Sequence, residues 1–101
     1  MLCRPEREIR QAVYGQAVDP VVYLLRCADD TLYCGWTVDL DKRVSAHNAG
    51  TASRYTRSRL PVEVLASISV SDKRAALREE ARVKRLRRPE KLALATRWPR
   101  P

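Results

Sequence analysis

Four side chains able to bind phosphate or exchange protons lie close together in the first half of the chain. Tyr23 and Tyr33 carry phenol groups, and Arg43 and His47 follow them, four residues apart. A guanidinium can hold two phosphate oxygens at once, and an imidazole exchanges protons near neutral pH. No other stretch combines so many reactive side chains, so we expect the function to reside between residues 21 and 56.

Two short strands are expected to carry the tyrosines. Residues 21–27 and 31–37 are rich in β-branched and aromatic side chains, and the polar turn 28–30 separates them. This pattern predicts an antiparallel β-hairpin. In the second strand Tyr33 lies near Gly35, which has no side chain and would leave room for a ligand.

The length of the hairpin loop decides where Tyr23 points. A three-residue loop places Tyr23 opposite Gly35 and beside Tyr33, whereas a two-residue loop would place it in the core, opposite Trp36. We predict the three-residue loop, because it lets both tyrosine hydroxyls reach a polar partner.

A helix over residues 38–49 is expected to position Arg43 and His47. These two residues lie one turn apart at the edge of its apolar face, from which both could point into a cleft over the hairpin. Two polar residues could cap its start and a glycine could end it: Thr37 or Asp39, and Gly50.

The basic loop 50–61 has two interpretations. Arg54, Tyr55 and Arg57 interleave cations with an aromatic ring, which suits phosphate contact and base stacking. The alternative is a solvated connector in which Tyr55 packs on the domain. The residues favour neither interpretation.

Beyond this loop the pattern predicts one more strand and two helices. Residues 62–70 alternate and predict a third strand. A helix over residues 72–87 is then expected, with Ser71 as its cap and Pro89 beyond its end. A short helix over residues 89–95 completes the domain. The apolar set of the strand is Val62, Val64, Ala66, Ile68 and Val70.

Glu80 is unusual in the helix over residues 72–87, because it lies on the apolar side of that helix. An ionised carboxylate on a buried face needs a partner charge or a metal ion. A salt bridge to Lys84 explains Glu80 as well as a metal does, and helix geometry alone leaves Glu79 as an alternative. The apolar side is defined by Ala76, Leu77, Val83 and Leu86.

Composition and charge restrict the class of protein. The 101 residues, 45% of them apolar, suffice for one domain with a modest core. Twenty basic against twelve acidic residues give a net charge of +8, which attracts polyanions such as nucleic acids. The three cysteines lack CxxC spacing, which argues against a zinc site or a disulfide framework. Without a long apolar run or a signal-like start, we predict a cytoplasmic protein without membrane contact.

Taken together, these residues resemble the GIY-YIG nuclease superfamily, and within it the small single-domain YhbQ-like branch, also called UPF0213. The two signature tripeptides correspond to Val21-Val22-Tyr23 and Tyr33-Cys34-Gly35. Val21 stands where the pattern has glycine and Cys34 where it has isoleucine, but neither position carries a catalytic group. The resemblance continues through Thr37, Arg43, His47, Asn48, Gly50, Ala76-Leu77-Arg78-Glu79-Glu80, Lys84 and Lys91.

The expected fold class is α/β (α+β), and the resemblance implies a small three-stranded, mostly antiparallel sheet flanked by helices. We assign this domain to residues 20–95, an N-terminal extension to residues 1–19 and a frayed tail to residues 96–101.

The resemblance also implies an activity, that of a metal-dependent endonuclease that hydrolyses phosphodiester bonds in DNA. One Mg²⁺ or Mn²⁺ ion would be held by Glu80 rather than Glu79. Tyr33 would be the base that activates water, and Tyr23 would orient it or share its proton. His47 would accept the proton from Tyr33 or contact the phosphate. The catalytic residues would be Tyr23, Tyr33, Arg43, His47 and Glu80, and the substrate-binding residues Lys84, Asn48, Arg54, Tyr55 and Arg57.

Low sequence specificity, selectivity for DNA structure and a role in DNA repair or processing are further expectations. Two alternatives stay open, a non-catalytic basic module that binds nucleic acid and an accessory subunit that needs a partner for nuclease activity. RNA as the nucleic acid, and a homodimer or protein partner, are open as well.

Overall fold

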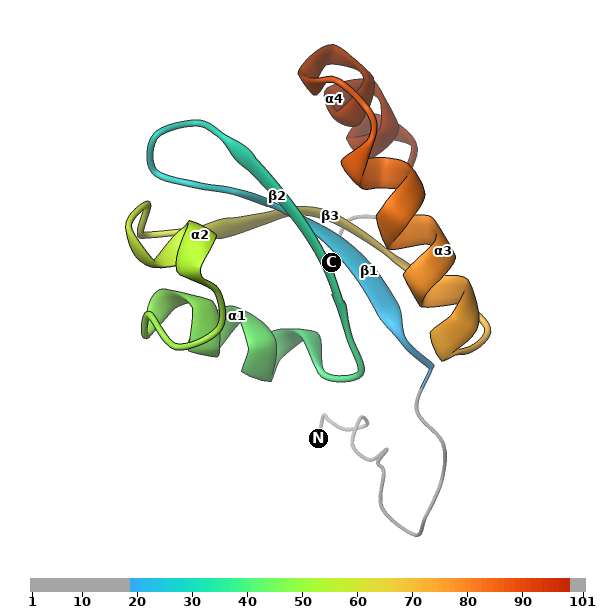
Figure 1. Ribbon diagram of the computed structural model, residues 1–101, viewed down its shortest axis with the longest axis horizontal. Coiled ribbons are helices and arrows are strands. Elements are labelled where there is room, and N and C mark those ends of the chain that lie inside the picture. Colours follow the sequence, from blue (N-terminus) through green and yellow to red (C-terminus); the bar gives the residue numbers. More distant parts are fainter. Residues whose placement is uncertain (1–18, 99–101) are drawn as a thin grey trace, which may run out of the picture.

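Three strands form one antiparallel sheet, in the order β2-β1-β3, in a computed structural model that describes residues 19–98 (Figure 1). Strand β1 (Val21–Arg26) is central, and β2 (Leu32–Thr37) and β3 (Glu63–Ser69) form the two edges. The predicted three-stranded architecture with flanking helices is confirmed. Apart from Asp19, the predicted N-terminal extension lies outside the described residues.

Strands β1 and β2 form the predicted hairpin with the predicted three-residue loop. Tyr23 pairs with Gly35, which puts Tyr23 and Tyr33 on one face of the sheet. The Cys27 N–H donates to the Thr31 carbonyl at 2.9 Å and closes the loop. The two-residue alternative is therefore wrong.

Only some of the residues that cap the helices were predicted from the sequence. Asp39 caps α1, which agrees with one of the two predicted caps, whereas Asp72 caps α3 in place of the predicted Ser71. Helix α2 is a single turn inside the predicted loop 50–61, capped by Ser53. No helix within residues 19–98 has the length and apolar character needed to cross a membrane. The helices are α1 (Leu40–Asn48), α2 (Arg54–Arg57), α3 (Lys73–Lys84) and α4 (Arg88–Arg97).

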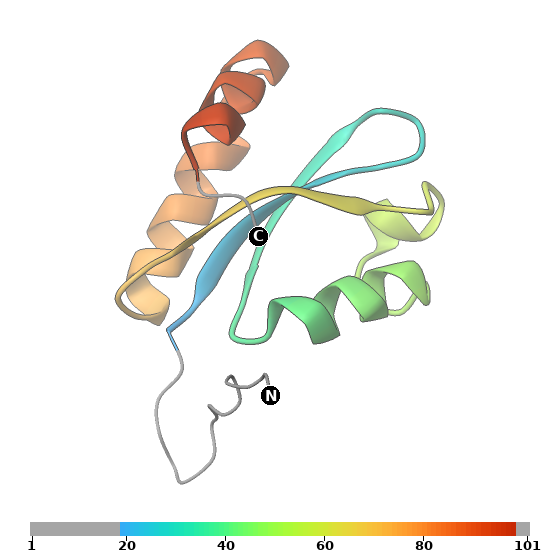
Figure 2. The same cartoon turned by 180° about the vertical axis from the view of Figure 1, so that it is seen from behind.

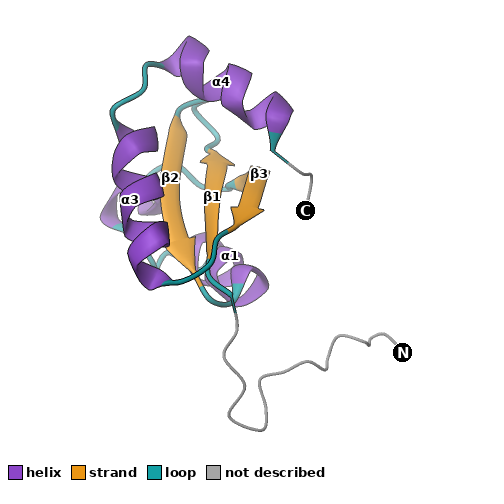
Figure 3. Ribbon diagram, turned by 90° about the vertical axis from the view of Figure 1, so that its right-hand side faces the viewer, coloured by secondary structure: helices purple, strands orange, loops and turns teal. Residues whose placement is uncertain are grey.

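Helices cover the sheet on both faces. Helices α3 and α4 pack on one face, and α1 and α2 lie on the other (Figure 2, Figure 3). We call these the α3–α4 layer and the α1–α2 layer. The core under the α3–α4 layer contains Val22, Leu24, Cys34, Ala66, Ala76, Val83, Leu94, Ala95 and Trp98. The core under the α1–α2 layer contains Tyr23, Leu25, Cys27 and Val62, with Leu40 and Val44 packed against it.

A β-bulge in β3 divides its apolar residues between the two layers. The register with β1 shifts between Leu24 and Leu25, which leaves Leu65 as an extra residue in β3. As a result Val64 belongs to the α1–α2 layer, whereas Ala66 belongs to the α3–α4 layer. The alternating residues of this strand therefore do not all share one face, although the predicted strand is confirmed.

Helix α4 extends the packed domain beyond its predicted boundary. It runs through Arg97, and Trp98 after it is only 6% exposed, in the core under the α3–α4 layer. Residues 96–98, predicted to begin a frayed tail, are therefore part of the packed domain. The rest of that predicted tail, residues 99–101, lies outside the described range.

Asn48 ties the end of α1 to the start of β3. Its Nδ2 donates to the Val62 carbonyl at 3.1 Å, and its Oδ1 accepts from the Val62 N–H at 2.8 Å. Both polar atoms of the side chain are bound to backbone, so the structure gives Asn48 a structural role, and its predicted substrate contact stays a prediction.

Replacing Asn48 with Ala is expected to lower the free energy of unfolding by about 1–3 kcal/mol, because the Val62 backbone loses both partners. Urea titration followed by circular dichroism measures the change. Ser45→Ala, at an exposed position of the same helix, is the control and should change stability by less than about 0.5 kcal/mol. An Asn48→Ala variant as stable as the wild type would contradict the structural role.

Candidate active site

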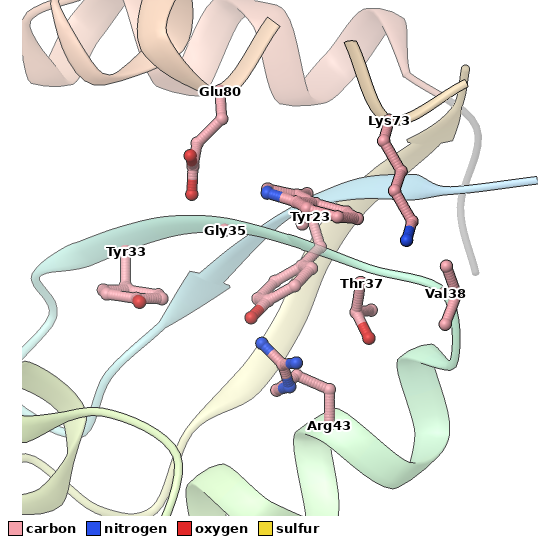
Figure 4. A pocket seen from close by; sticks show the side chains of 9 residues that line it. Tyr23, Tyr33, Gly35, Thr37, Val38, Arg43, Lys73 and Glu80 are labelled. Atoms are coloured by element: carbon pink, nitrogen blue, oxygen red, sulfur yellow. The ribbon is translucent and has the colours of Figure 1, made fainter. Parts of the chain in front are cut away.

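A cavity of about 350 Å³ opens along β2, the edge strand, and both helical layers contribute to its wall (Figure 4). Four of the five predicted catalytic residues meet here, although they come from β1, β2, α1 and α3. The wall consists of Tyr23, Tyr33, Gly35, Trp36, Thr37, Val38, Arg43, Lys73 and Glu80.

Tyr23 lies across the neighbouring strand, directly over Gly35. A Cβ atom at Gly35 would lie 2.6 Å from the Tyr23 hydroxyl oxygen and 2.8 Å from its Cζ, closer than non-bonded atoms approach one another. The Tyr23 ring can therefore occupy this place only because residue 35 is glycine. The space over Gly35 that was predicted for a ligand is filled by the Tyr23 ring, and the cavity opens beside that ring.

A chain of buried hydrogen bonds runs from Tyr23 away from the cavity. The Tyr23 hydroxyl lies 2.9 Å from His47 Nε2, and His47 Nδ1 lies 2.8 Å from Thr56 Oγ1. The Thr56 hydroxyl lies 3.4 Å from the carbonyl oxygen of Ser53, the cap of α2. His47 is only 1% exposed, so it lies behind Tyr23 and does not point into the cleft as predicted.

Burial determines the protonation states of Tyr23 and His47. It raises the pKa of Tyr23 to about 12, although the neighbouring Arg43 guanidinium acts in the opposite direction. Burial also lowers the pKa of His47 below its usual 6.5, and the charge of Arg43 lowers it further. At neutral pH, Tyr23 is therefore a phenol and His47 is a neutral imidazole.

Tyr33 is half-buried in the cavity wall and packs against two other rings. Its ring centroid lies 5.2 Å from that of His47, edge to face, and 5.8 Å from that of Tyr55. His47 Nε2, expected to accept a proton from Tyr33, is hydrogen-bonded to Tyr23 instead. The polar partner of His47 Nε2 is therefore Tyr23.

Tyr55 is held between Tyr33 and Arg59. The Arg59 guanidinium carbon lies 4.0 Å from the Tyr55 ring centroid, and its Nε lies 3.0 Å from an oxygen of Asp29 in the hairpin turn. Tyr55 is packed on the domain and yet 38% exposed, so both interpretations of the basic loop describe part of it. The other predicted substrate contacts on α2 are exposed and lie outside the cavity wall: Arg54 and Arg57.

Glu80 is the acidic residue of the cavity wall. Its side chain is 20% exposed, and one carboxylate oxygen lies 3.4 Å from Lys84 Nζ. The predicted salt bridge and the predicted inward carboxylate therefore coexist. Glu79 is outside the wall and pairs with Arg82 through N–O distances of 2.6 and 3.1 Å, which lowers the pKa of Glu79.

Lys73 is a cavity residue that the sequence analysis missed. It precedes Glu80 by nearly two helical turns on the same side of α3, so the periodicity that singled out Glu80 would also have found it. Lys84 follows Glu80 by one turn, and its Nζ lies 6.0 Å from the Tyr33 ring centroid. Leu77, predicted on the apolar side, is instead 53% exposed.

Thr56 was missed as well. It is one of several hydroxyl residues in the loop 50–61, and its contact with His47 depends on how α2 packs. The one local signal is Ser53, a good helix cap just before it.

The cavity wall offers a single carboxylate to a cation. Within residues 19–98, no three His, Cys, Asp or Glu side chains converge on a common point as a multi-ligand metal site would require. The single carboxylate of Glu80 would leave the other positions of an octahedral ion to water and substrate, as Mg²⁺ commonly requires.

Comparison with known proteins gives consistent matches. Residues 19–93 match the family model of the GIY-YIG catalytic domain. A UPF0213 protein of Lactococcus lactis subsp. cremoris is 53% identical over 55 residues, which are 54% of this chain and 56% of that relative. A UPF0213 protein of Natronomonas pharaonis is 44% identical over 75 residues, 74% of this chain and 88% of the relative.

A solved structure resembles the chain in fold and sequence. The solution NMR structure of the UPF0213 protein BH0048 from Bacillus halodurans superimposes with a TM-score of 0.51 at 37% identity, covering 78% of this chain and 84% of that one. The names of these relatives specify no reaction.

Protonation of His47 should make folding stability fall as the pH drops below about 6.5. The unfolded chain binds a proton at the usual histidine pKa, whereas the folded chain binds it only at lower pH, so stability rises with pH through this window. Urea titrations between about pH 5 and 7.5 measure the slope. His47 is the only histidine in the chain, so His47→Gln should remove this component; an unchanged slope would contradict the lowered pKa.

Proposed function

The chain belongs to the GIY-YIG family, in its UPF0213 branch, and we propose that it is a divalent-metal-dependent endonuclease that hydrolyses phosphodiester bonds in DNA. The observation that carries the proposal is the cavity at the β2 edge, where a carboxylate, a guanidinium and two phenols meet. These groups can hold a cation, bind a phosphate and transfer a proton.

Glu80 is the residue that would hold the cation, which is Mg²⁺ or Mn²⁺. When bound, such an ion polarises a phosphate oxygen and stabilises the charge of the leaving oxygen. Lys84, 3.4 Å from the carboxylate, orients Glu80, and Lys73 adds positive charge to the same cavity wall. Both lysines therefore support the binding of an anionic phosphate next to Glu80.

Water activation is assigned to Tyr23 and His47 together. The Tyr23 oxygen takes a proton from a water molecule while the Tyr23 proton moves to His47 Nε2, 2.9 Å away. The hydroxide attacks phosphorus, and the bond from phosphorus to the leaving oxygen breaks. The net proton acceptor is the imidazole, so the high pKa of Tyr23 does not prevent the step. Tyr33, the base that the resemblance implied, positions the water or the phosphate.

Arg43 is placed to bind the non-bridging oxygens of the phosphate. Its guanidinium is exposed, lines the cavity and lies next to the Tyr23 hydroxyl (Figure 4). Contacts to phosphate position a nucleic acid without reading its sequence, which supports low sequence specificity. A role in DNA repair or processing is part of the proposal. Arg54 and Arg57 extend the cationic surface along α2.

A non-catalytic nucleic-acid-binding module is the second candidate. It is favoured by the ion pair between Glu80 and Lys84, which accounts for the carboxylate without a metal. Plasmid nicking in Mg²⁺, Mn²⁺ or EDTA separates the two functions. DNA binding without metal-dependent nicking supports the module, and nicking only after addition of a cell fraction supports the accessory subunit.

Replacing Glu80 with Gln should lower Mg²⁺-dependent nicking at least about a hundredfold, because the cation loses its charged ligand. Glu79→Gln is the matched control on the same helix, since Glu79 lies outside the cavity and pairs with the exposed Arg82. Its activity should stay within about twofold of the wild type. Undiminished nicking by a folded Glu80→Gln variant would rule out Glu80 as the metal ligand.

The catalytic roles of Tyr23 and Tyr33 can be distinguished by removing one hydroxyl at a time. Tyr23→Phe should lower single-turnover cleavage by about 10²–10⁴-fold, because the water loses its path to His47. The ring over Gly35 is kept, so the fold should persist. Tyr33→Phe should have the smaller effect; if it has the larger one, Tyr33 is the base.

A further inference from the structure

The hydrogen-bond chain behind Tyr23 ends at a residue to which the proposed function gives no role. Thr56 is 0% exposed and lies outside the cavity wall. Its hydroxyl oxygen lies 2.8 Å from His47 Nδ1 and 3.4 Å from the Ser53 carbonyl oxygen. The hydrogen bond made by one ring nitrogen of a histidine determines which nitrogen carries the proton.

One arrangement of hydrogens gives every donor in this chain an acceptor within the protein. In it the Thr56 hydroxyl donates to the Ser53 carbonyl, which can only accept, and accepts from His47 Nδ1–H. His47 Nε2 then carries no hydrogen and accepts from the Tyr23 hydroxyl. The Tyr23 oxygen keeps its lone pairs for Arg43, which can only donate.

The reverse arrangement is less favourable at both ends of the chain. If Thr56 donated to His47 Nδ1, its hydroxyl would no longer donate to the Ser53 carbonyl 3.4 Å away, which would keep only the Arg57 N–H at 3.1 Å. His47 Nε2–H would then donate to the Tyr23 oxygen. The Tyr23 hydrogen would turn towards the cavity wall, where the neighbouring Arg43 presents only hydrogens.

We propose that Thr56 is a positioning residue that keeps neutral His47 in the Nδ1–H tautomer, so that Nε2 is free to accept the proton of Tyr23. In the other tautomer Nε2 already carries a hydrogen, and the transfer from Tyr23 has no acceptor. The catalytic consequence rests on the proposed function. The tautomer itself is a property of the free protein and can be tested without DNA.

Nitrogen NMR reads the tautomer directly, because His47 is the only histidine in the chain. Protein labelled with ¹⁵N at histidine, with any polyhistidine tag removed, gives one pair of ring-nitrogen signals. At neutral pH the wild type should show a protonated Nδ1 and an unprotonated Nε2. Thr56→Val keeps the shape of the side chain without its hydroxyl and should lose this preference, whereas Thr56→Ser should retain it.

Tyr23→Phe shows whether Thr56 or Tyr23 sets the tautomer. This variant retains the Thr56 hydroxyl, so Nδ1 of His47 should stay protonated. A wild-type imidazole protonated at Nε2, or a Tyr23→Phe variant that switches to Nε2–H, would overturn the proposal. Neither measurement requires that Thr56→Val folds.

Cleavage kinetics test the catalytic consequence. Thr56→Val should lower kcat for plasmid nicking roughly a hundredfold, with KM within about twofold, because Thr56 does not reach the cavity. Thr56→Ser should restore most of the rate. A folded Thr56→Val enzyme with wild-type kcat would overturn the positioning role. Absence of cleavage by every form, with the Nδ1–H tautomer present, would count against the nuclease function and leave the tautomer assignment supported.

Discussion

The close contact between Tyr23 and Gly35 is the constraint on which the site depends. Because Gly35 has no Cβ atom, the Tyr23 ring can lie across β2, and its hydroxyl reaches both the cavity and His47. A side chain at Gly35 would lift the ring away from the strand. The hydroxyl would then lose the imidazole behind it and Arg43 beside it. The absence of a Cβ atom at residue 35 thus determines how the Tyr23, His47 and Arg43 side chains are arranged.

The contact between Tyr23 and Gly35 borders an open cavity because β2 lies at the edge of the sheet. An inner strand has hydrogen-bonded neighbours on both sides, whereas an edge strand leaves one side open. Arg43 from the α1–α2 layer and Glu80 from the α3–α4 layer can therefore approach the same cavity from opposite faces of the sheet. The sheet separates the two layers over most of its area, so such a meeting of groups is possible only along an edge.

The sequence predicts those features that depend on local periodicity. Loop length gives the register that pairs Tyr23 with Gly35, and the helical period brings Glu80 to the buried side of α3. Features that arise from packing between distant segments were not predicted. Leu65 forms a bulge that no alternation reveals, and the contact of Thr56 with the imidazole depends on the packing of a one-turn helix. The elements of the site were thus predictable, but the hydrogen-bond chain behind Tyr23 was not.

Helix α2 makes this small domain a demanding scaffold for protein engineering. A single turn has little helical stability of its own, so α2 depends on its Ser53 cap and on Arg59, which joins the segment to Asp29. Exposed loops are the usual places to graft a recognition module onto a catalytic domain. The segment between α1 and β3 is exposed on its outside, yet its inner side holds Thr56 against a buried imidazole. A chimera joined there would retain every residue of the cavity wall and still lose the tautomer that the cavity needs.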